Sequence, residues 1–147
     1  MADGDPLDTL RLRKDALQGL VNAIEAGKGP APANTRRVHE RRPYVDHAVV
    51  LTISDGDPAR NGGMLLNPRA FLVCSRNLSR GGVGLLHGGF LHPGTWCQVR
   101  LRDLRGAEQT FTGRVAACRH VTGRVHEVGI RFEKPLEIDA FTAAPAG

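Results

Sequence analysis

Apolar residues near the amino terminus recur at helical spacing. Steps of three or four positions separate most members of the series, which is Leu7, Leu10, Leu17, Leu20, Val21 and Ile24. A helix places residues at such steps on one face. Asp5 can cap its start, Pro6 suits a first turn and Gly27 suits an end. The pattern predicts an amphipathic helix over residues 6–26, in an N-terminal unit of residues 1–27, that docks on the domain or pairs with a second copy.

From Tyr44 onward the pattern changes to that of strands. Stretches rich in β-branched residues alternate with turns that contain Gly, Pro, Asn and Asp. The six predicted strands are Tyr44–Ile53, Ala70–Ser75, Val83–His87, Trp96–Arg102, Gln109–His120 and Val125–Phe132. Short strands at such turn-separated intervals predict an all-β fold, a six-stranded antiparallel barrel.

The segments around the strands complete the predicted domain organisation. Residues 28–35 form a linker rich in Pro, Gly and Ala, and the barrel domain extends over residues 36–141. Leu136–Phe141 is predicted to form one helical turn that closes an end of the barrel. We expect a frayed tail at residues 142–147.

The composition agrees with one small β domain. A length of 147 residues suits a single domain with an appendage. Hydrophobic residues make up 41% of the chain and aromatic residues only 5%, so the core must consist mostly of Val, Leu, Ile and Ala. The 18 glycines and 9 prolines favour many turns.

Several functional classes are disfavoured by missing motifs. The three cysteines form no CxxC pair and the histidines lack the spacing of a helical metal site, so we expect no metal or cofactor. Walker, H-E-x-x-H and G-x-S-x-G motifs are absent, which argues against an enzyme. No apolar run approaches the roughly 20 residues of a membrane span. The first residues do not resemble a signal peptide, so we expect a cytoplasmic protein.

Positive charge is concentrated after residue 30. The net charge is +5, whereas residues 1–30 carry −1, which leaves +6 on the remainder. Four arginines lie within seven residues, at Arg36, Arg37, Arg41 and Arg42. Arginine presents a planar fork of donors that matches phosphate and the acceptor edge of guanine. Taken alone, such a run is more often a solvated basic linker.

A second polar stretch follows forty residues after Arg37 and joins two predicted strands. Asn77 and Ser79 carry short polar side chains that can bond the backbone or a ligand. Gly81 and Gly82 permit close approach of another molecule to the main chain. Taken alone, N-x-S-x-x-G is as readily an ordinary turn.

Together the two stretches resemble the PilZ family of bacterial cyclic di-GMP receptors. The R-x-x-x-R motif of that family matches Arg37–Arg41, and its [D/N]-x-S-x-x-G motif matches Asn77–Gly82. The segments Leu91–Trp96 and His126–Phe132 also look like the family. The resemblance covers residues 35–140. It implies a PilZ-type β-barrel and a non-catalytic receptor, whose outer face binds the ligand while the arginine arm folds over it.

The resemblance also implies roles for individual residues. Arg37 and Arg41 would clamp phosphates and guanine edges, and Asn77 and Ser79 would bond a guanine. Gly82 would keep the turn open. Arg36, just before the first motif arginine, favours a stacked dimer of the ligand over a single molecule. Further candidate ligand-binding arginines are Arg42, Arg76 and Arg119.

Other binding functions and partners are also considered. One alternative is a PilZ-like protein-interaction adaptor that binds no nucleotide, although such members usually lose the arginines or the Asx–Ser pair. Binding to RNA or single-stranded DNA requires exposed aromatic platforms, which one Trp, one Tyr and five Phe poorly supply. Besides cyclic di-GMP, the expected partner is an unknown downstream protein, or a second copy that associates through the N-terminal helix.

Overall fold

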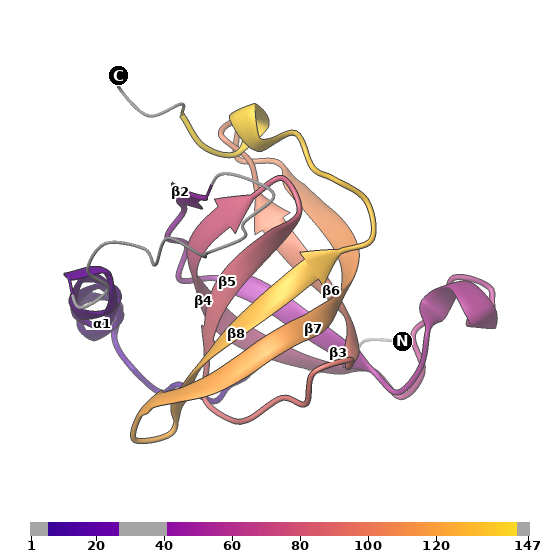
Figure 1. Ribbon diagram of the computed structural model, residues 1–147, viewed down its shortest axis with the longest axis horizontal. Helices are drawn as coiled ribbons and strands as arrows, with labels where there is room; N and C mark the ends of the chain where they lie inside the picture. The colour runs from indigo at the N-terminus through magenta and orange to yellow at the C-terminus, as the bar shows by residue number, and fades with distance from the viewer. Residues whose placement is uncertain (1–5, 27–40, 144–147) are drawn as a thin grey trace, which may run out of the picture.

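Six strands close into an antiparallel barrel in the computed structural model, which describes residues 6–26 and 41–143 (Figure 1). The barrel strands are β3 (Val49–Ser54), β4 (Arg69–Ser79), β5 (Gly82–His87), β6 (Trp96–Arg102), β7 (Glu108–Thr122) and β8 (Val125–Phe132). The other elements are β1 (Leu7–Asp8), the helix α1 (Lys14–Ala26), β2 (Arg42–Pro43) and the 3-10 turns η1 (Pro58–Asn61) and η2 (Ile138–Ala140). The predicted all-β barrel with an N-terminal helix and a C-terminal turn is confirmed.

Alternation of apolar and polar residues determines which side chains fill the barrel. The strands follow the order β4–β3–β6–β7–β8–β5, and β5 pairs with β4 to close the circle. In β6, Val99 and Leu101 are buried, whereas Arg100 and Arg102 face solvent. The core is composed largely of Val, Leu and Ile, joined by Phe132 and Phe141. One face of each strand therefore contributes side chains to the core, and the opposite face contributes side chains to the outer surface.

Strand β4 has partners on both of its edges. Its first half, Arg69–Val73, pairs with β3, and its second half, Cys74–Ser79, pairs with β5 on the opposite edge. Strand β1 runs parallel to Phe71–Leu72, on the edge that β5 leaves unoccupied. Strand β2 pairs with Asn77–Leu78, on the edge that β3 leaves unoccupied. The chain on either side of the 27–40 segment is thus anchored to opposite halves of β4.

The N-terminal helix begins later than the sequence predicts. Residues 6–13 are not helical, and α1 begins at Lys14. The backbone at Arg11 has a φ of 54°, and its amide donates to the Asp8 carboxylate at 3.0 Å. The open edge of β4 offers backbone hydrogen bonds that a helix there would forgo, so Leu7 and Asp8 join the sheet.

Helix α1 docks on the outer surface of the barrel. Leu17 and Val21 are buried in a cluster that also contains Leu10, which precedes the helix, and Cys74, Leu86 and Val125 from β4, β5 and β8. Figure 1 shows α1 beside β4. The barrel itself therefore covers the apolar stripe of the helix. Docking on the domain is one of the two arrangements that the sequence predicts, and pairing with a second copy is the other.

Four predicted strands have different bounds in the structure, and two of them, the first and the second, differ by more than two residues at one end. The strand predicted at Tyr44–Ile53 begins only at Val49. The strand predicted at Ala70–Ser75 continues to Ser79, because the chain takes up one extra residue near Arg76 and keeps its pairing with β5. Asn77 and Ser79 consequently lie in a strand and not in a loop.

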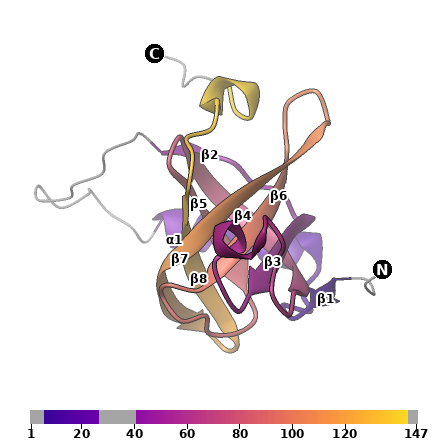
Figure 2. The same ribbon diagram turned by 90° about the vertical axis from the view of Figure 1, so that its right-hand side faces the viewer.

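The C-terminal segment closes the end of the barrel at which β2 lies (Figure 2). The single helical turn predicted over Leu136–Phe141 is shorter, η2, and Phe141 packs edge-on against Tyr44 and Phe111. Thr142 is buried and its amide donates to the carbonyl of Ile138 at 2.9 Å, so the predicted fraying does not include Thr142. Within residues 6–26 and 41–143, no helix is long and apolar enough to cross a membrane.

Candidate ligand-binding site

A β-bulge in β4 places the polar residues of the second stretch on the outer surface. Ser75 lies opposite Leu85, but Asn77 already lies opposite Gly84, so Arg76 is an extra residue in the ladder. A bulge interrupts the alternation of faces. Before it Val73 faces the core, and after it Leu78 does. Arg76 and Asn77 therefore both face outward, although they are adjacent in sequence.

Strand β2 brings the arginine arm to Asn77. Pro43 lies opposite Asn77 in the β2–β4 pair. From the residue just before β2, the Arg41 Nη1 atom donates a hydrogen bond of 2.9 Å to the Asn77 Oδ1 atom. The structure therefore joins one predicted residue from each of the two stretches, which are 36 positions apart in sequence.

Glycines form a floor without side chains next to this hydrogen bond. Gly84 lies opposite Asn77 on one side and opposite Gly129 on the other. A Cβ atom at Gly84 would lie only 2.5 Å from Asn77 Oδ1 and 3.7 Å from Arg41 Nη1. A Cβ atom at Gly129 would meet nothing closer than the Ala117 carbonyl oxygen at 4.0 Å. The floor is thus open to a planar ring over Gly129, whereas the Asn77 and Arg41 side chains lie over Gly84.

Ser79 and Gly82 face one another where β4 turns into β5. They form the last pair of the ladder, and the Ser79 hydroxyl donates to the Gly82 carbonyl at 3.4 Å. A Cβ atom at Gly82 would lie 2.2 Å from the Ile130 carbonyl oxygen. Gly82 is therefore needed for the close approach of β8, a steric role that adds to the open turn that the sequence predicts.

Arg76 and Arg119 share the carboxylate of Glu127. Arg76 Nε donates to Glu127 Oε2 at 2.5 Å, and Arg119 Nη2 lies 2.8 Å from Glu127 Oε1. Burial raises the pKa of Glu127, but the two guanidiniums outweigh burial and lower the pKa below its usual value. Both predicted arginines thus face the outer surface, where they share one carboxylate, and the three groups together keep one positive charge.

The sequence does not single out Glu127 as a site residue. Strands β7 and β8 form a hairpin, and counting back from its last pair, Thr122 and Val125, would place His120 opposite Glu127. A register shift between His120 and Thr122 places Arg119 there instead. Opposite charges at facing positions of a hairpin stabilise it. The pairing register, which the prediction left undetermined, would have revealed the contact.

Arg42 points away from Asn77. It lies opposite Leu78, whose side chain is in the core, and its Nη1 atom lies 2.7 Å from Asp139 Oδ1 in η2. Only 13% of the Arg42 side chain is exposed. Arg42 therefore ties β2 to the C-terminal turn and does not join Arg41 and Asn77. Arg36, Arg37 and the predicted linker lie outside the described residues.

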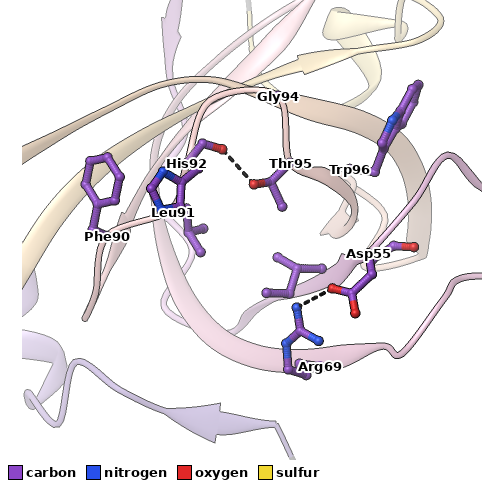
Figure 3. Close-up of a pocket in the computed structure, with 10 residues that line it drawn as sticks. Asp55, Arg69, Phe90, Leu91, His92, Gly94, Thr95 and Trp96 are labelled. Atoms are coloured by element: carbon purple, nitrogen blue, oxygen red, sulfur yellow. Dashed lines mark hydrogen bonds and ion pairs between the residues drawn. The ribbon is translucent and has the colours of Figure 1, made fainter.

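A separate pocket of about 330 Å³ opens near the start of β4 (Figure 3). Phe90, His92 and Trp96 line it, together with an ion pair of 2.9 Å between Arg69 and Asp55. Hydrogen bonds from Arg69 and Asn67 lower the pKa of Asp55. Arg69 and Asn77 are eight residues apart along β4, which is roughly 25 Å of strand. The pocket is thus distinct from the site around Asn77.

The outer surface of β4, β5 and β8 thus combines features that suit one kind of ligand. A guanidinium and an amide oxygen supply a cationic donor and a neutral acceptor, beside the open backbone surface at Gly129, which a planar ring can approach. Nothing in this arrangement resembles a nucleophile with its base. In the described part of the chain, no three His, Cys, Asp or Glu residues are grouped to hold a metal ion.

Comparison with known proteins identifies the domain. The family model described as PilZ domain matches residues 35–143, which is most of the chain and contains both polar stretches. No curated protein matches the chain. The chain therefore belongs to the PilZ domain family, whose members are in general non-catalytic modules that bind cyclic di-GMP.

Proposed function

We propose that this chain is a non-catalytic receptor that binds cyclic di-GMP on the outer surface of β4, β5 and β8. The observation that carries the proposal is the hydrogen bond from Arg41 to Asn77 across Gly84, because it joins the arginine motif to the N-x-S-x-x-G motif. Family membership supports the same ligand. Ser79 and Gly82 belong to the same site, and Arg36 and Arg37 act from the arm.

The chemistry of the ligand matches the chemistry of the site. Cyclic di-GMP is a dianion with two guanine bases. The Arg41 guanidinium can donate to a phosphate or to the O6 and N7 atoms of guanine. Asn77 Oδ1 accepts from the guanine N1–H or amino group, and the Ser79 hydroxyl adds a donor. The Gly84–Gly129 floor lets a base lie against the backbone.

Binding requires Asn77 to exchange partners. Without ligand, the Asn77 oxygen accepts a hydrogen bond from Arg41. A guanine edge would take over the Asn77 oxygen, and Arg41 would turn to the ligand together with Arg37. Asn77 offers one neutral acceptor where an aspartate would offer two charged oxygens, so we expect a weaker hold on guanine than an aspartate would give.

Calorimetric titration with cyclic di-GMP tests the proposal. We expect micromolar or tighter binding by the wild-type chain and no binding by the Arg37→Ala, Arg41→Ala double variant. A stoichiometry of two ligands per chain would support the stacked dimer that Arg36 favours. The matched control is the Arg60→Ala, Arg105→Ala variant, which loses the same charge at exposed positions away from the site and should bind normally.

A folded wild-type protein that gives no heat would refute the receptor function. That result would favour the adaptor that binds no nucleotide, and a search for a protein that binds α1 would follow. Equal loss of binding in the control variant would show that net charge, and not the arginine motif, determines affinity.

A further inference from the structure

We propose, on the basis of the function above, that Glu127 sets the affinity of the site by competing with the ligand for Arg119. Its carboxylate is an anion built into the binding surface. A phosphate of cyclic di-GMP must take its place beside Arg119 before that arginine can contribute to binding. The class of ligand is unchanged, and the new element is a residue that weakens binding.

The pairing register places Glu127 on the ligand surface. Glu127 lies opposite Leu86 in β5 and opposite Arg119 in β7. It is two residues before Gly129, so both face the same side of β8. Gly129 in turn lies opposite Gly84, over which Arg41 reaches Asn77. The acid is thus one step along the strand from the floor of the site.

The bulge in β4 brings a second arginine to the same acid. Because Arg76 is the extra residue, its side chain faces outward next to that of Asn77. Arg76 is bound to Glu127 Oε2, and only 3% of its side chain is exposed. The Arg76 pair is therefore a buried part of the structure and holds the carboxylate in place.

Arg119 is the partner that can be exchanged. Its side chain is 62% exposed, and its Nε and Nη2 atoms bond to Glu127 Oε1 at 3.0 and 2.8 Å. The Glu127 side chain is only 13% exposed, but it stays paired with Arg76 when Arg119 leaves. Water solvates the Arg119 guanidinium, so loss of this contact costs little free energy. A phosphate can consequently replace Glu127 as the partner of Arg119, whereas Arg76 stays paired.

Titration of the full-length Glu127→Gln variant with cyclic di-GMP tests the competition. Glutamine keeps the size of the side chain and an acceptor oxygen for Arg76 but removes the charge. We expect binding about three- to tenfold tighter than wild type, the effect of one partly exposed ionic contact. The gain in affinity should become smaller as salt is added, because salt screens the attraction between the freed Arg119 and the phosphate of the ligand.

Glu108→Gln is the matched control. Glu108 also lies between two arginines of the barrel, 3.6 Å from Arg100 and 3.9 Å from Arg102. The Glu108→Gln substitution changes the net charge of the protein by the same amount as Glu127→Gln. We expect its affinity for cyclic di-GMP to equal that of wild type, and a gain as large as that of Glu127→Gln would overturn the proposal.

The Arg119→Ala background distinguishes competition from simple repulsion between Glu127 and the ligand. If Glu127 acts by occupying Arg119, Glu127→Gln gives no gain when Arg119 is absent. A gain that persists there, or unchanged or weaker binding by a folded Glu127→Gln variant, overturns the proposal. Thermal unfolding of each variant establishes that it is folded. Wild-type binding with no gain refutes this inference alone, whereas no binding by wild type or Glu127→Gln refutes the proposed function as well.

Discussion

Gly84 and Gly129 leave part of the outer surface of the barrel without side chains. The two residues face one another across β5 and β8, beside the hydrogen bond between Arg41 and Asn77. They differ in how much space surrounds them. A Cβ atom at Gly84 would push on the Asn77 amide, whereas one at Gly129 meets open space. Gly129 therefore permits a test of the floor that leaves the fold intact.

Replacing Gly129 with leucine should block ligand binding without unfolding the protein. The new side chain would cover the surface on which a base is proposed to lie. We expect affinity for cyclic di-GMP to fall by about tenfold or more, equivalent to about 1.4 kcal/mol, with little change in melting temperature. Calorimetry and thermal unfolding measure the two effects. Ala59→Leu, at an exposed position in η1, is the control, and normal binding by Gly129→Leu would exclude this floor from the site.

Tyr44 is a second residue whose surroundings make a measurable prediction. Its hydroxyl donates to the Arg102 carbonyl at 2.5 Å and accepts from the Arg102 amide at 3.0 Å. Burial raises the pKa of Tyr44 from 10.0 to about 12. The neutral form is therefore favoured in the folded state, and the stability that results is complete below pH 10 and is lost as the pH rises through about 12.

Tyr44→Phe should lower stability near neutral pH but reduce its loss in alkali. We expect the variant to be less stable by about 1 kcal/mol where tyrosine is neutral, because two hydrogen bonds are lost. The two stability curves should converge as the pH rises from 10 to about 12. Thermal unfolding across this range measures the difference. Since Tyr44 is the single tyrosine, tyrosinate absorbance gives its pKa directly, and an ordinary value would contradict the prediction.

Among the elements, α1 is the one whose attachment can be followed separately from the barrel. It covers Cys74, which lies on the outer surface of β4. Burial raises the pKa of Cys74 to about 12. Cys97 has the same raised pKa but lies in the barrel core. The two thiols therefore report on two different parts of the fold.

Leu17→Ala should make Cys74 reactive while Cys97 stays protected. Truncation of a buried leucine costs about 2–5 kcal/mol, and here the loss falls on the contact between α1 and the barrel. We expect thiol labelling of Cys74 to accelerate by about tenfold or more. Mass spectrometry of labelled peptides distinguishes the cysteines. Leu104→Ala, at an exposed position, should change neither rate, and equal acceleration at both cysteines would show that α1 opens only with the whole fold.

Local patterns explain which elements could be predicted and which could not. The six strands follow from alternation, since core residues such as Val99 and Leu101 recur at every second position. The start of α1 could not be predicted in this way, because the three-residue step from Leu7 to Leu10 fits a helix, whereas Leu7 lies in the two-residue strand β1 and Leu10 lies outside it. Tertiary pairing with Phe71 and Leu72 decides between a helix and a strand there.

The candidate site depends on features that the sequence does not display. Alternation alone would put Asn77 on the opposite face from Arg76, and only the bulge places both outward. Arg42 and Arg41 are adjacent and chemically identical, yet pairing with Leu78 turns Arg42 toward Asp139. Motif spacing identified Asn77, Ser79 and Arg41 as candidates. Motif spacing could not determine which of the neighbouring arginines lie on the same surface as these three residues.

Viewed as a whole molecule, the barrel hides backbone groups as well as apolar side chains. An exposed strand edge carries unpaired amides and carbonyls and is a template on which another chain can add a strand. The two-residue strands β1 and β2 cover the parts of β4 that its longer neighbours leave open. These two short strands contribute little to the stability of the fold, but they remove an exposed edge at which aggregation can begin. Loss of β1 would therefore harm solubility more than thermal stability, since it opens an edge while leaving the barrel core complete.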